Sequence, residues 1–265
     1  MRINTTVYDR SPLLTYTPHE AWLESPAFAS SSYHFTDSDN ASVSFQWFGT
    51  AIWLYGNFSS VSGAYNAMVD DSATNFTSQD LFTHETPMLL YSATNLSQTN
   101  LHTMRLFNLA NTLKFTHLVF ETEITSDGDS VDVDQSYNGS SSFSYLPNQH
   151  GLAAPSDLKD GSGSLDIPTL RFNFTGLAIA LYGIPSVYPS SFAIILDDTA
   201  TQRFISNSLI STLDVDNTSD IPVQQTDAQD QVSSNNSSQL IYFASNLSEG
   251  PHQLLIFDYG NGTNT

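Results

Sequence analysis

Hydrophobic and polar residues alternate in short runs along this chain, in the pattern of β-strands. Phe45, Trp47 and Gly49 alternate with polar or small neighbours, and residues 51–55 form an apolar run that ends at Gly56. Alternation with period two is typical of a strand with one buried face, and a short apolar run suits the core of a sandwich. No long stretch shows a convincing helical period. The pattern therefore predicts an all-β protein of sandwich or jelly-roll architecture.

The same strand pattern occurs twice in the chain. Residues 45–56, FQWFGTAIWLYG, align with residues 172–183, FNFTGLAIALYG, at an offset of 127. At the same offset, residues 65–71 align with residues 192–198. Each of these segments ends in two aspartates, which predict a hairpin turn. Such self-similarity predicts two copies of one structural unit.

The second copy differs from the first in two places. The offset becomes longer further along, which implies an insertion that we place in the polar, acidic stretch 214–236 and interpret as a surface loop. The first copy has a last strand at 114–124, whereas the second copy reaches Thr265 where its equivalent would begin. We therefore expect two tandem, related β-sandwich domains, 1–126 and 127–265, the second without its last strand. Either the natural chain continues, or a neighbouring molecule donates a strand to the open edge and builds an assembly.

Several segments resemble a domain of fungal, especially basidiomycete, cell-surface proteins. They are residues 7–18 (VYDRSPLLTYTP) with Trp22, the pair Tyr33 and His34, the strand pair 45–56 and the hairpin 65–71. The resemblance covers nearly the whole chain. It implies a tandem pair of galactose-binding-like jelly rolls at the cell surface, frequently ahead of a membrane helix, and it implies little about function. The chain departs from the family at Asp71 and Asp198, where the family usually has glycine.

Glycosylation acceptor sequences are unusually frequent. The sequence Asn-x-Ser/Thr occurs at twelve of the 19 asparagines, which implies passage through a secretory pathway. We expect a secreted or cell-surface glycoprotein, the ectodomain of a longer precursor, because the chain shows neither a signal peptide nor a run long enough to span a membrane. The acceptor positions are Asn4, Asn40, Asn57, Asn75, Asn95, Asn138, Asn173, Asn217, Asn235, Asn236, Asn246 and Asn261.

The charge balance excludes some classes of partner. The chain has 27 acidic and 7 basic residues, for a net charge of −20. Nucleic acid would be repelled, since its binding needs clustered Lys and Arg, and an anionic membrane surface would be repelled as well. Cysteine is absent, so disulfides and thiolate metal sites are excluded.

We find no arrangement of residues that predicts catalysis. The stretch 161–164, GSGS, lacks the spacing of a nucleophile elbow and is interpreted as a loop. Glu121 and Glu123 share one strand face, as a glycosidase pair would, but the second copy has no counterpart. His102 and His252 occupy equivalent positions, which favours a structural role. We therefore expect a protein that is not an enzyme.

A metal site is a weaker possibility. Hard carboxylate oxygens suit Ca²⁺, but the spacing of the acidic cluster between the two copies does not match an EF-hand loop. Val131 and Val133 alternate with aspartates, which favours a strand whose carboxylates face solvent. We expect no cofactor, with Ca²⁺ as the alternative at Asp127, Asp129, Asp132 and Asp134.

Carbohydrate binding is the specific function that the sequence favours. Sugar rings stack on exposed aromatic side chains, and four candidate residues, Trp22, Tyr33, His34 and Tyr188, lie in loop-like stretches. Trp47 and Trp53 lie within strands and are expected to be buried. The sequence thus predicts a non-catalytic extracellular module that binds glycan or cell-wall polysaccharide. The alternative is a structural or adhesive protein that self-assembles through the open edge of the second domain.

Overall fold

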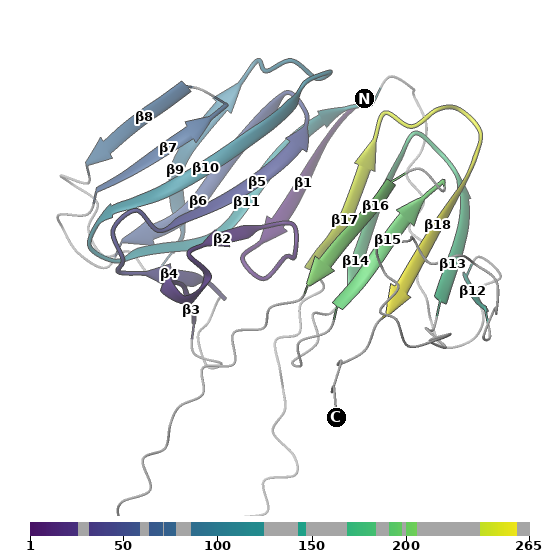
Figure 1. Cartoon of the computed structure of the whole chain (residues 1–265). Helices are drawn as coiled ribbons and strands as arrows, with labels where there is room; N and C mark the ends of the chain where they lie inside the picture. Colours follow the sequence, from purple (N-terminus) through teal and green to yellow (C-terminus); the bar gives the residue numbers. More distant parts are fainter. Residues whose placement is uncertain are drawn as a thin grey trace, which may run out of the picture.

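The computed structural model describes residues 1–25, 32–58, 64–70, 72–77, 86–124, 143–146, 169–183, 191–197, 200–205 and 239–258. We call residues 1–124 the first half and residues 143–258 the second half. Apart from one 3-10 turn, His19–Ala21, every regular element in these ranges is a β-strand (Figure 1). The prediction of an all-β protein is confirmed.

The first half is a sandwich of two antiparallel sheets. One sheet has the order β3-β4-β11-β6-β9, and β1 also pairs with β11, which gives six strands. The other has the order β2-β5-β10-β7-β8. The strands are β1 (Arg2–Tyr8), β2 (Thr15–Thr17), β3 (Leu23–Glu24), β4 (His34–Thr36), β5 (Ser42–Phe48), β6 (Ala51–Phe58), β7 (Ala64–Val69), β8 (Ser72–Thr77), β9 (Met88–Thr94), β10 (Leu101–Ala110) and β11 (Leu113–Glu123).

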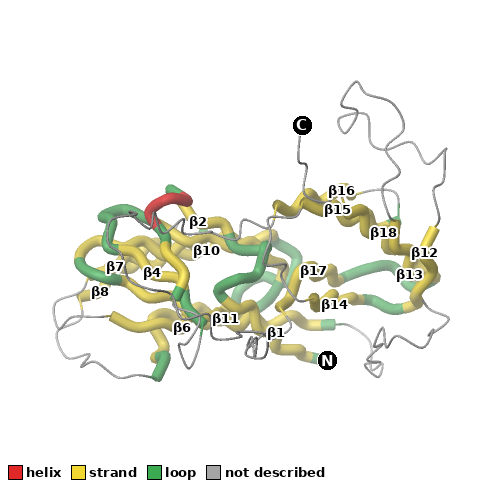
Figure 2. The backbone as a smooth tube through the Cα atoms, turned by 90° about the horizontal axis from the view of Figure 1, so that it is seen from below, coloured by secondary structure: helices red, strands yellow, loops and turns green. Residues whose placement is uncertain are grey.

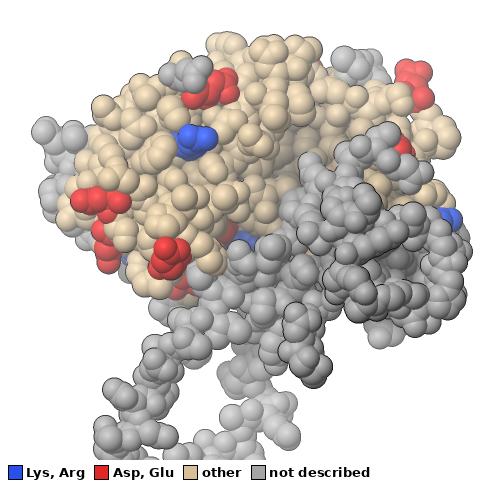
Figure 3. Space-filling model, viewed as in Figure 1, with Lys and Arg blue, Asp and Glu red and all other residues tan. Residues whose placement is uncertain are grey.

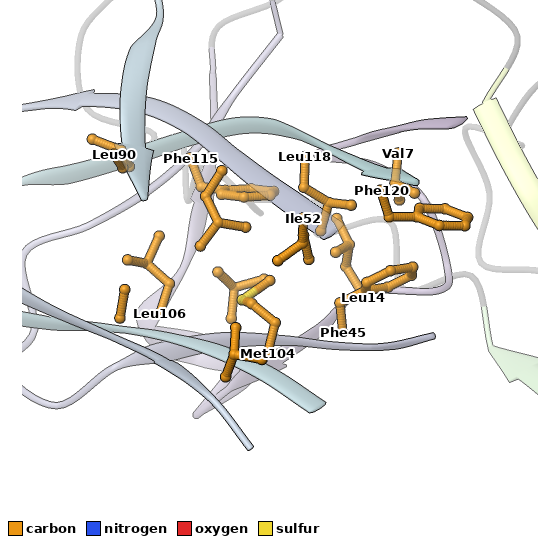
Figure 4. Packing of buried hydrophobic residues seen from close by; sticks show 14 of the residues in the cluster. Val7, Leu14, Phe45, Ile52, Leu90, Met104, Leu106, Phe115, Leu118 and Phe120 are labelled. Carbon is orange, nitrogen blue, oxygen red and sulfur yellow. The ribbon is translucent and has the colours of Figure 1, made fainter. Parts of the chain in front are cut away.

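Strand β11 is the centre of the six-stranded sheet, because it alone pairs with three strands, β1, β4 and β6. Alternate side chains of β11 and β6 point into the space between the sheets and are fully buried there, among them Ile52, Leu54, Leu118 and Phe120 (Figure 4). The opposite sheet contributes Met104 and its neighbours to the same cluster. Burial of this apolar surface is the main favourable contribution to the fold.

The second half repeats the order of the five-stranded sheet, as β12-β13-β18-β15-β16. Opposite it lies a sheet of two strands, β14 and β17, in the second of the two layers that Figure 2 shows in both halves. By sequence alignment β14 corresponds to β6, and β17 to β9. The described residues of this half contain no counterpart of β1, β3, β4 or β11. Its strands are β12 (Phe143–Leu146), β13 (Thr169–Thr175), β14 (Ala178–Gly183), β15 (Ser191–Leu196), β16 (Ala200–Ile205), β17 (Gln239–Ser245) and β18 (Pro251–Asp258).

The two halves touch through β17. Leu240 is fully buried within the hydrophobic cluster of the first half, and the ring of Phe243 meets that of Phe120 edge-on at 5.0 Å. The Ser11 hydroxyl donates a 2.5 Å hydrogen bond to the Leu240 carbonyl, and Gln98 donates to the Asn246 side chain at 3.2 Å. The predicted domain boundary at 126 and the predicted insertion at 214–236 lie outside the described residues.

Candidate functional site

Two of the four residues predicted to bind sugar lie inside the first half. Trp22 is fully buried and belongs to the main hydrophobic cluster, and His34 is also buried. The expectation that these two are exposed loop aromatics is therefore wrong. The short strands β3 and β4, which the sequence pattern does not reveal, carry them inward. Tyr33 is half-buried, and Tyr188 lies outside the described residues.

His34 belongs to a buried polar network around Asp9. The Asp9 carboxylate lies 3.0 Å from His34 Nδ1 and accepts a 2.6 Å hydrogen bond from the Ser32 hydroxyl. The Tyr16 hydroxyl donates to the Asp9 carbonyl at 2.7 Å, and its ring stacks on that of His34 at 4.5 Å. Since Ser32 bonds the carboxylate and not the imidazole, the trio lacks the contact between base and nucleophile that activates a serine. The network instead joins β4 to the segment that follows β1 through hydrogen bonds.

Two further charged side chains, Glu24 and Arg10, extend this network. Glu24 Oε1 lies 3.8 Å from His34 Nε2, and Glu24 Oε2 pairs with Arg10 at 3.4 Å. Burial raises the pKa of Tyr16 well above its ordinary value, and the nearby carboxylates of Asp9 and Glu24 raise it further. The Tyr16 phenol therefore stays neutral and remains a donor. Asp9, Tyr16, Trp22 and His34 are thus packing residues of this edge of the first half.

A second polar cluster, the histidine clasp, occurs once in each half. In the first half, Asp70 Oδ2 lies 2.8 Å from His102 Nδ1, and Oδ1 accepts a hydrogen bond from the Thr103 N–H. In the second half, Asp197 Oδ2 lies 2.6 Å from His252 Nδ1, and Oδ1 accepts from the Gln253 N–H. Both aspartates have positive φ, 53° and 52°, at the ends of β7 and β15. The recurrence favours a structural role in fixing the turn.

The other ring nitrogen of each clasp histidine also faces an acceptor. His102 Nε2 lies 2.8 Å from the Ser97 carbonyl oxygen, and His252 Nε2 lies 2.8 Å from that of Ser248. A carbonyl oxygen can only accept, so this contact requires an N–H on Nε2. Each clasp therefore holds both ring nitrogens, one against a carboxylate and the other against a main-chain carbonyl.

The outer face of the six-stranded sheet is rich in aromatic side chains. Tyr8, His117 and Tyr55 are directly opposite one another on β1, β11 and β6, and Tyr55 is opposite Leu89 on β9. Trp53 lies two residues before Tyr55 on β6 and shares its outward direction. We call these five residues the aromatic face. Tyr8 is 42% exposed and Leu89 is 49% exposed, while the other three are half-buried.

The rings of the aromatic face contact one another. His117 stacks on Tyr55 with centroids 4.6 Å apart and planes 9° apart, and Tyr8 lies 5.9 Å from His117 at 44°. Burial lowers the pKa of His117, against an opposing effect of the Asp9 charge. His117 is therefore neutral near pH 7, and its Nδ1 lies 3.1 Å from the Thr116 hydroxyl. Because the middle rings pack on each other, Tyr8 at the end of the row offers the most accessible ring.

Polar groups border the aromatic face at both ends. At one end, Glu121 accepts a 2.6 Å hydrogen bond from Thr50 and lies 3.6 Å from Arg2, beside the exposed Asn4. At the other end, the Lys114 ammonium lies 5.1 Å from the centre of the Tyr33 ring. The surface thus combines apolar rings with hydrogen-bonding groups on rigid strands.

The outer face of the five-stranded sheet in the same half is different. Its exposed positions are largely polar and pair across strands, as Gln46 does with Thr103 at 3.2 Å and Asn66 with Asn75 at 2.5 Å. Its exposed large apolar residues are Phe48 opposite Leu101 at one end and Leu109 at the other end of β10. An outward sheet face is normally polar, so the aromatic face is the better candidate for a binding surface.

Sequence reasoning missed the aromatic face. Trp53 was expected to be buried because it lies in an apolar run, but the structure turns it to the outer side, half-buried, whereas Trp47 is buried as expected. The signal that could have found the face is the alternation of Trp53 and Tyr55 with the fully buried Ile52 and Leu54.

Charged side chains are sparse on the face of the protein seen in Figure 3, where Lys and Arg lie singly among scattered Asp and Glu. In the described ranges, no three His, Asp or Glu side chains are grouped so that they could hold a metal ion. Over the same ranges, no helix has the length and apolar character to cross a membrane. The candidate Ca²⁺ ligands Asp127, Asp129, Asp132 and Asp134 lie outside the described residues.

Neither a protein-family model nor a curated protein matches this chain. Similar solved structures include the CBM36-1 domain of a multidomain xylanase from the hindgut metagenome of Trinervitermes trinervoides, at 16% identity and a TM-score of 0.34, over 49% of this chain and 100% of that one. The C-terminal CBM6 of a laminarinase from Zobellia galactanivorans is similar at 8% identity and a TM-score of 0.35, over 46% of this chain and 100% of that one.

Two further solved structures are similar, one over part of this chain and one over nearly all of it. A family two carbohydrate esterase from Cellvibrio japonicus matches at 10% identity and a TM-score of 0.38, over 46% of this chain and 35% of the esterase. The tandem CBM22-1-CBM22-2 domain of Paenibacillus barcinonensis Xyn10C matches at 7% identity and a TM-score of 0.30, over 97% of this chain and 90% of that one. These four structures are carbohydrate-binding modules and a carbohydrate esterase, and the insecticidal crystal protein Cry2Aa is similar as well, at a TM-score of 0.33. At these TM-scores the likenesses carry no argument about function.

Proposed function

We propose that this protein is an extracellular module that binds neutral carbohydrate on the aromatic face of its first half. The observation that carries the proposal is the row Tyr8–His117–Tyr55, which crosses three strands of an outward sheet face and ends in a tyrosine that is 42% exposed. The apolar C–H faces of a sugar ring pack on aromatic rings, and its hydroxyls need donors and acceptors at the rim. His117 and Glu121 supply such groups.

The net charge favours a neutral ligand over an acidic one. At −20 the chain repels polyanions, and the aromatic face has few cations to offset this. The extracellular setting is supported by the acceptor asparagines. Six of those in the described ranges are exposed at the surface, where a glycan has room: Asn4, Asn40, Asn75, Asn95, Asn173 and Asn246.

The proposal is tested by binding of the deglycosylated chain to immobilised neutral and acidic polysaccharides. Tyr8→Ala is expected to weaken binding about fivefold, because one ring contact is worth about 1 kcal/mol. Tyr55→Ala is expected to weaken it by more, because it also removes the support of His117. Phe48→Ala is the matched control, since Phe48 is 43% exposed on the other sheet of the same half.

If Phe48→Ala weakened binding as much as Tyr8→Ala does, the site would not be confined to the aromatic face. Loss of binding counts only if the variant keeps the circular dichroism spectrum and unfolding midpoint of the original chain. A fold-retaining chain that binds none of the polysaccharides would end the proposal.

We also propose that the chain acts without catalysis. Glu121, one member of the carboxylate pair considered from the sequence, is engaged by Thr50 and Arg2 and is only 17% exposed. Among the described residues, the serine beside the buried Asp9–His34 pair, Ser32, bonds the carboxylate and not the imidazole. Release of reducing ends or acetate from a bound polysaccharide would contradict this part of the proposal.

Self-assembly is a second candidate function, and one observation favours it. Among the described strands, β14 pairs with β17 alone, and a strand at the edge of a sheet is where a second copy could add a strand of its own. The test is size-exclusion chromatography with light scattering over a wide range of concentration. A mass that rises with concentration is expected, and a constant monomer mass would contradict self-assembly.

A further inference from the structure

An acceptor sequence for N-glycosylation lies on the same surface as the aromatic face. The sequence is Asn4-Thr5-Thr6, and it falls entirely within β1. Thr5 and Val7 point inward and are buried. Asn4, Thr6 and Tyr8 alternate with them and point outward, and Asn4 and Tyr8 are exposed. A glycan on Asn4 therefore starts on the sheet face that carries Tyr8.

The strand register arranges the outward residues of β1, β11 and β6 in three rows that cross the sheet. From the acceptor to the most exposed ring, the rows are Asn4–Glu121, Thr6–Val119–Trp53 and Tyr8–His117–Tyr55. Successive rows are two residues apart along a strand, so the first and third rows are separated by about 13 Å. The first few sugars of a glycan that lies flat along β1 cover that distance.

The middle row supplies apolar surface along this path. Val119 and Trp53 are half-buried, so part of each side chain is in contact with water. The C–H faces of sugar rings pack on such side chains, and the sugar hydroxyls bond polar groups beside them. The Glu121 carboxylate, on the residue directly opposite Asn4, is an acceptor at the start of the path. The face thus offers an attached sugar both kinds of contact.

Covalent attachment favours the glycan on Asn4 over any free ligand as the occupant of this face. A group held by a short flexible linker reaches its site at an effective concentration of about millimolar. Tyr8, at 42% exposure, is the most accessible ring, and a surface with so few open rings binds a free sugar weakly. The core sugars of an N-glycan are neutral, so the net charge of −20 does not oppose their contact.

We propose that the N-glycan on Asn4 folds back along β1 and covers the aromatic face of its own chain. The regulatory consequence rests on the proposed function of that face: the chain takes up polysaccharide only while the glycan is trimmed or swung away. If the glycan covers the face about nine-tenths of the time, the apparent affinity for polysaccharide is about tenfold lower than that of the uncovered face.

Nitration of Tyr8 measures the cover without any added ligand. The chain is secreted from a eukaryotic host and treated with tetranitromethane, and peptide mass spectrometry reports both the nitration and the glycan on Asn4. Tyr8 is expected to react about tenfold more slowly in the original chain than in Asn4→Gln, in proportion to the uncovered fraction. Thr6→Ala removes the acceptor sequence but keeps Asn4, and it is expected to match Asn4→Gln. Tyr182, which is 53% exposed in the second half, is the reference ring.

Two further variants locate the cover. Asn75→Gln removes an exposed acceptor from β8, on the other sheet of the same half, and should leave the nitration of Tyr8 unchanged. Asn57 follows Tyr55 by two residues on β6, which places a second acceptor at the opposite end of the aromatic face. If Asn57→Gln exposed Tyr8 and Asn4→Gln did not, the cover would come from β6 and the proposal would be wrong.

Two other results would overturn the proposal: an Asn4 without glycan, or equal nitration of Tyr8 in the original chain and in Asn4→Gln. Polysaccharide binding is measured on the same samples and tests the proposed function separately. Faster nitration of Asn4→Gln with no binding by either chain would support the cover and end the proposed function. Equal nitration with equal binding would end the cover and keep the function.

Discussion

At the scale of single residues, the histidine clasps link stability to pH. Burial raises the pKa of Asp197, but hydrogen bonds from the Gln253 N–H and from His252 outweigh it, so the pKa lies below 3.8. The hydrogen bond to Asp197 raises the pKa of His252 above 6.5, against the smaller effect of burial. The carboxylate therefore stabilises the fold above about pH 4, and this is lost as the pH falls through its lowered pKa. The imidazolium stabilises the fold below about pH 6.5, and this is lost as the pH rises through its raised pKa.

Asp197→Asn should remove the contributions of both Asp197 and His252 to the pH dependence of stability. The substitution removes the carboxylate itself and the negative charge that raises the pKa of His252. We expect the free energy of unfolding of the original chain to fall on both sides of a maximum between about pH 4 and 6.5, and that of the variant to vary less. Urea denaturation from pH 3 to pH 9, followed by the near-ultraviolet circular dichroism, measures this. An unchanged profile would show that the clasp contributes no net stability. Asp39→Asn, at an exposed position outside both clasps, is the control.

Local pattern predicts these residues only in part. The equivalent positions of His102 and His252 indicated a shared structural role, but the partners are residues 32 and 55 positions away, which only the strand register brings together. The burial of Trp22 was not predicted from the sequence. The apolar run Ala21-Trp22-Leu23 is too short to show a period, so the full burial of Trp22 is seen only in the fold.

At the scale of elements, the two equivalent glycines Gly56 and Gly183 should respond differently to the same change. Gly56→Ala forces its methyl against the β11 backbone at Lys114 and against Leu90, so we expect a loss of about 2 kcal/mol of stability. Gly183→Ala needs only a small movement of the Ile241 side chain, so its effect should stay within about 0.5 kcal/mol. Chemical denaturation of both variants measures the difference. Equal losses would mean that a backbone lies beside Gly183 as well.

The strands themselves follow from the sequence, but their order does not. Alternation located β5, β6 and the β7–β8 hairpin, and the repeat located their counterparts. The position of β11 between β6 and both β1 and β4 depends on pairing between distant segments, which no local pattern encodes. For the same reason, alternation on β6 separates Ile52 and Leu54 from Trp53 and Tyr55, but it does not predict which of the two pairs faces the core.

At the scale of the whole molecule, equivalent residues on the outer faces of β9 and β17 differ in their exposure to solvent. Tyr55 is opposite Leu89 in the first half, and the aligned Tyr182 is opposite Leu240 in the second. Leu89 is 49% exposed, whereas Leu240 is fully buried against the first half. The outer face of β17 thus joins the two halves, whereas the equivalent face of the first half is exposed at Leu89.

This equivalence provides a matched pair of substitutions for the contact between the halves. Leu240→Ala should lower the free energy of unfolding by about 3 kcal/mol, because it leaves a cavity in the hydrophobic cluster of the first half. Leu89→Ala should change it by no more than about 0.5 kcal/mol, because Leu89 is largely in water. Urea denaturation followed by tryptophan fluorescence measures the first half directly, since Trp22, Trp47 and Trp53 all lie there. If Leu240→Ala left that transition unmoved, the second half would contribute nothing to the core of the first, and the halves would be independent.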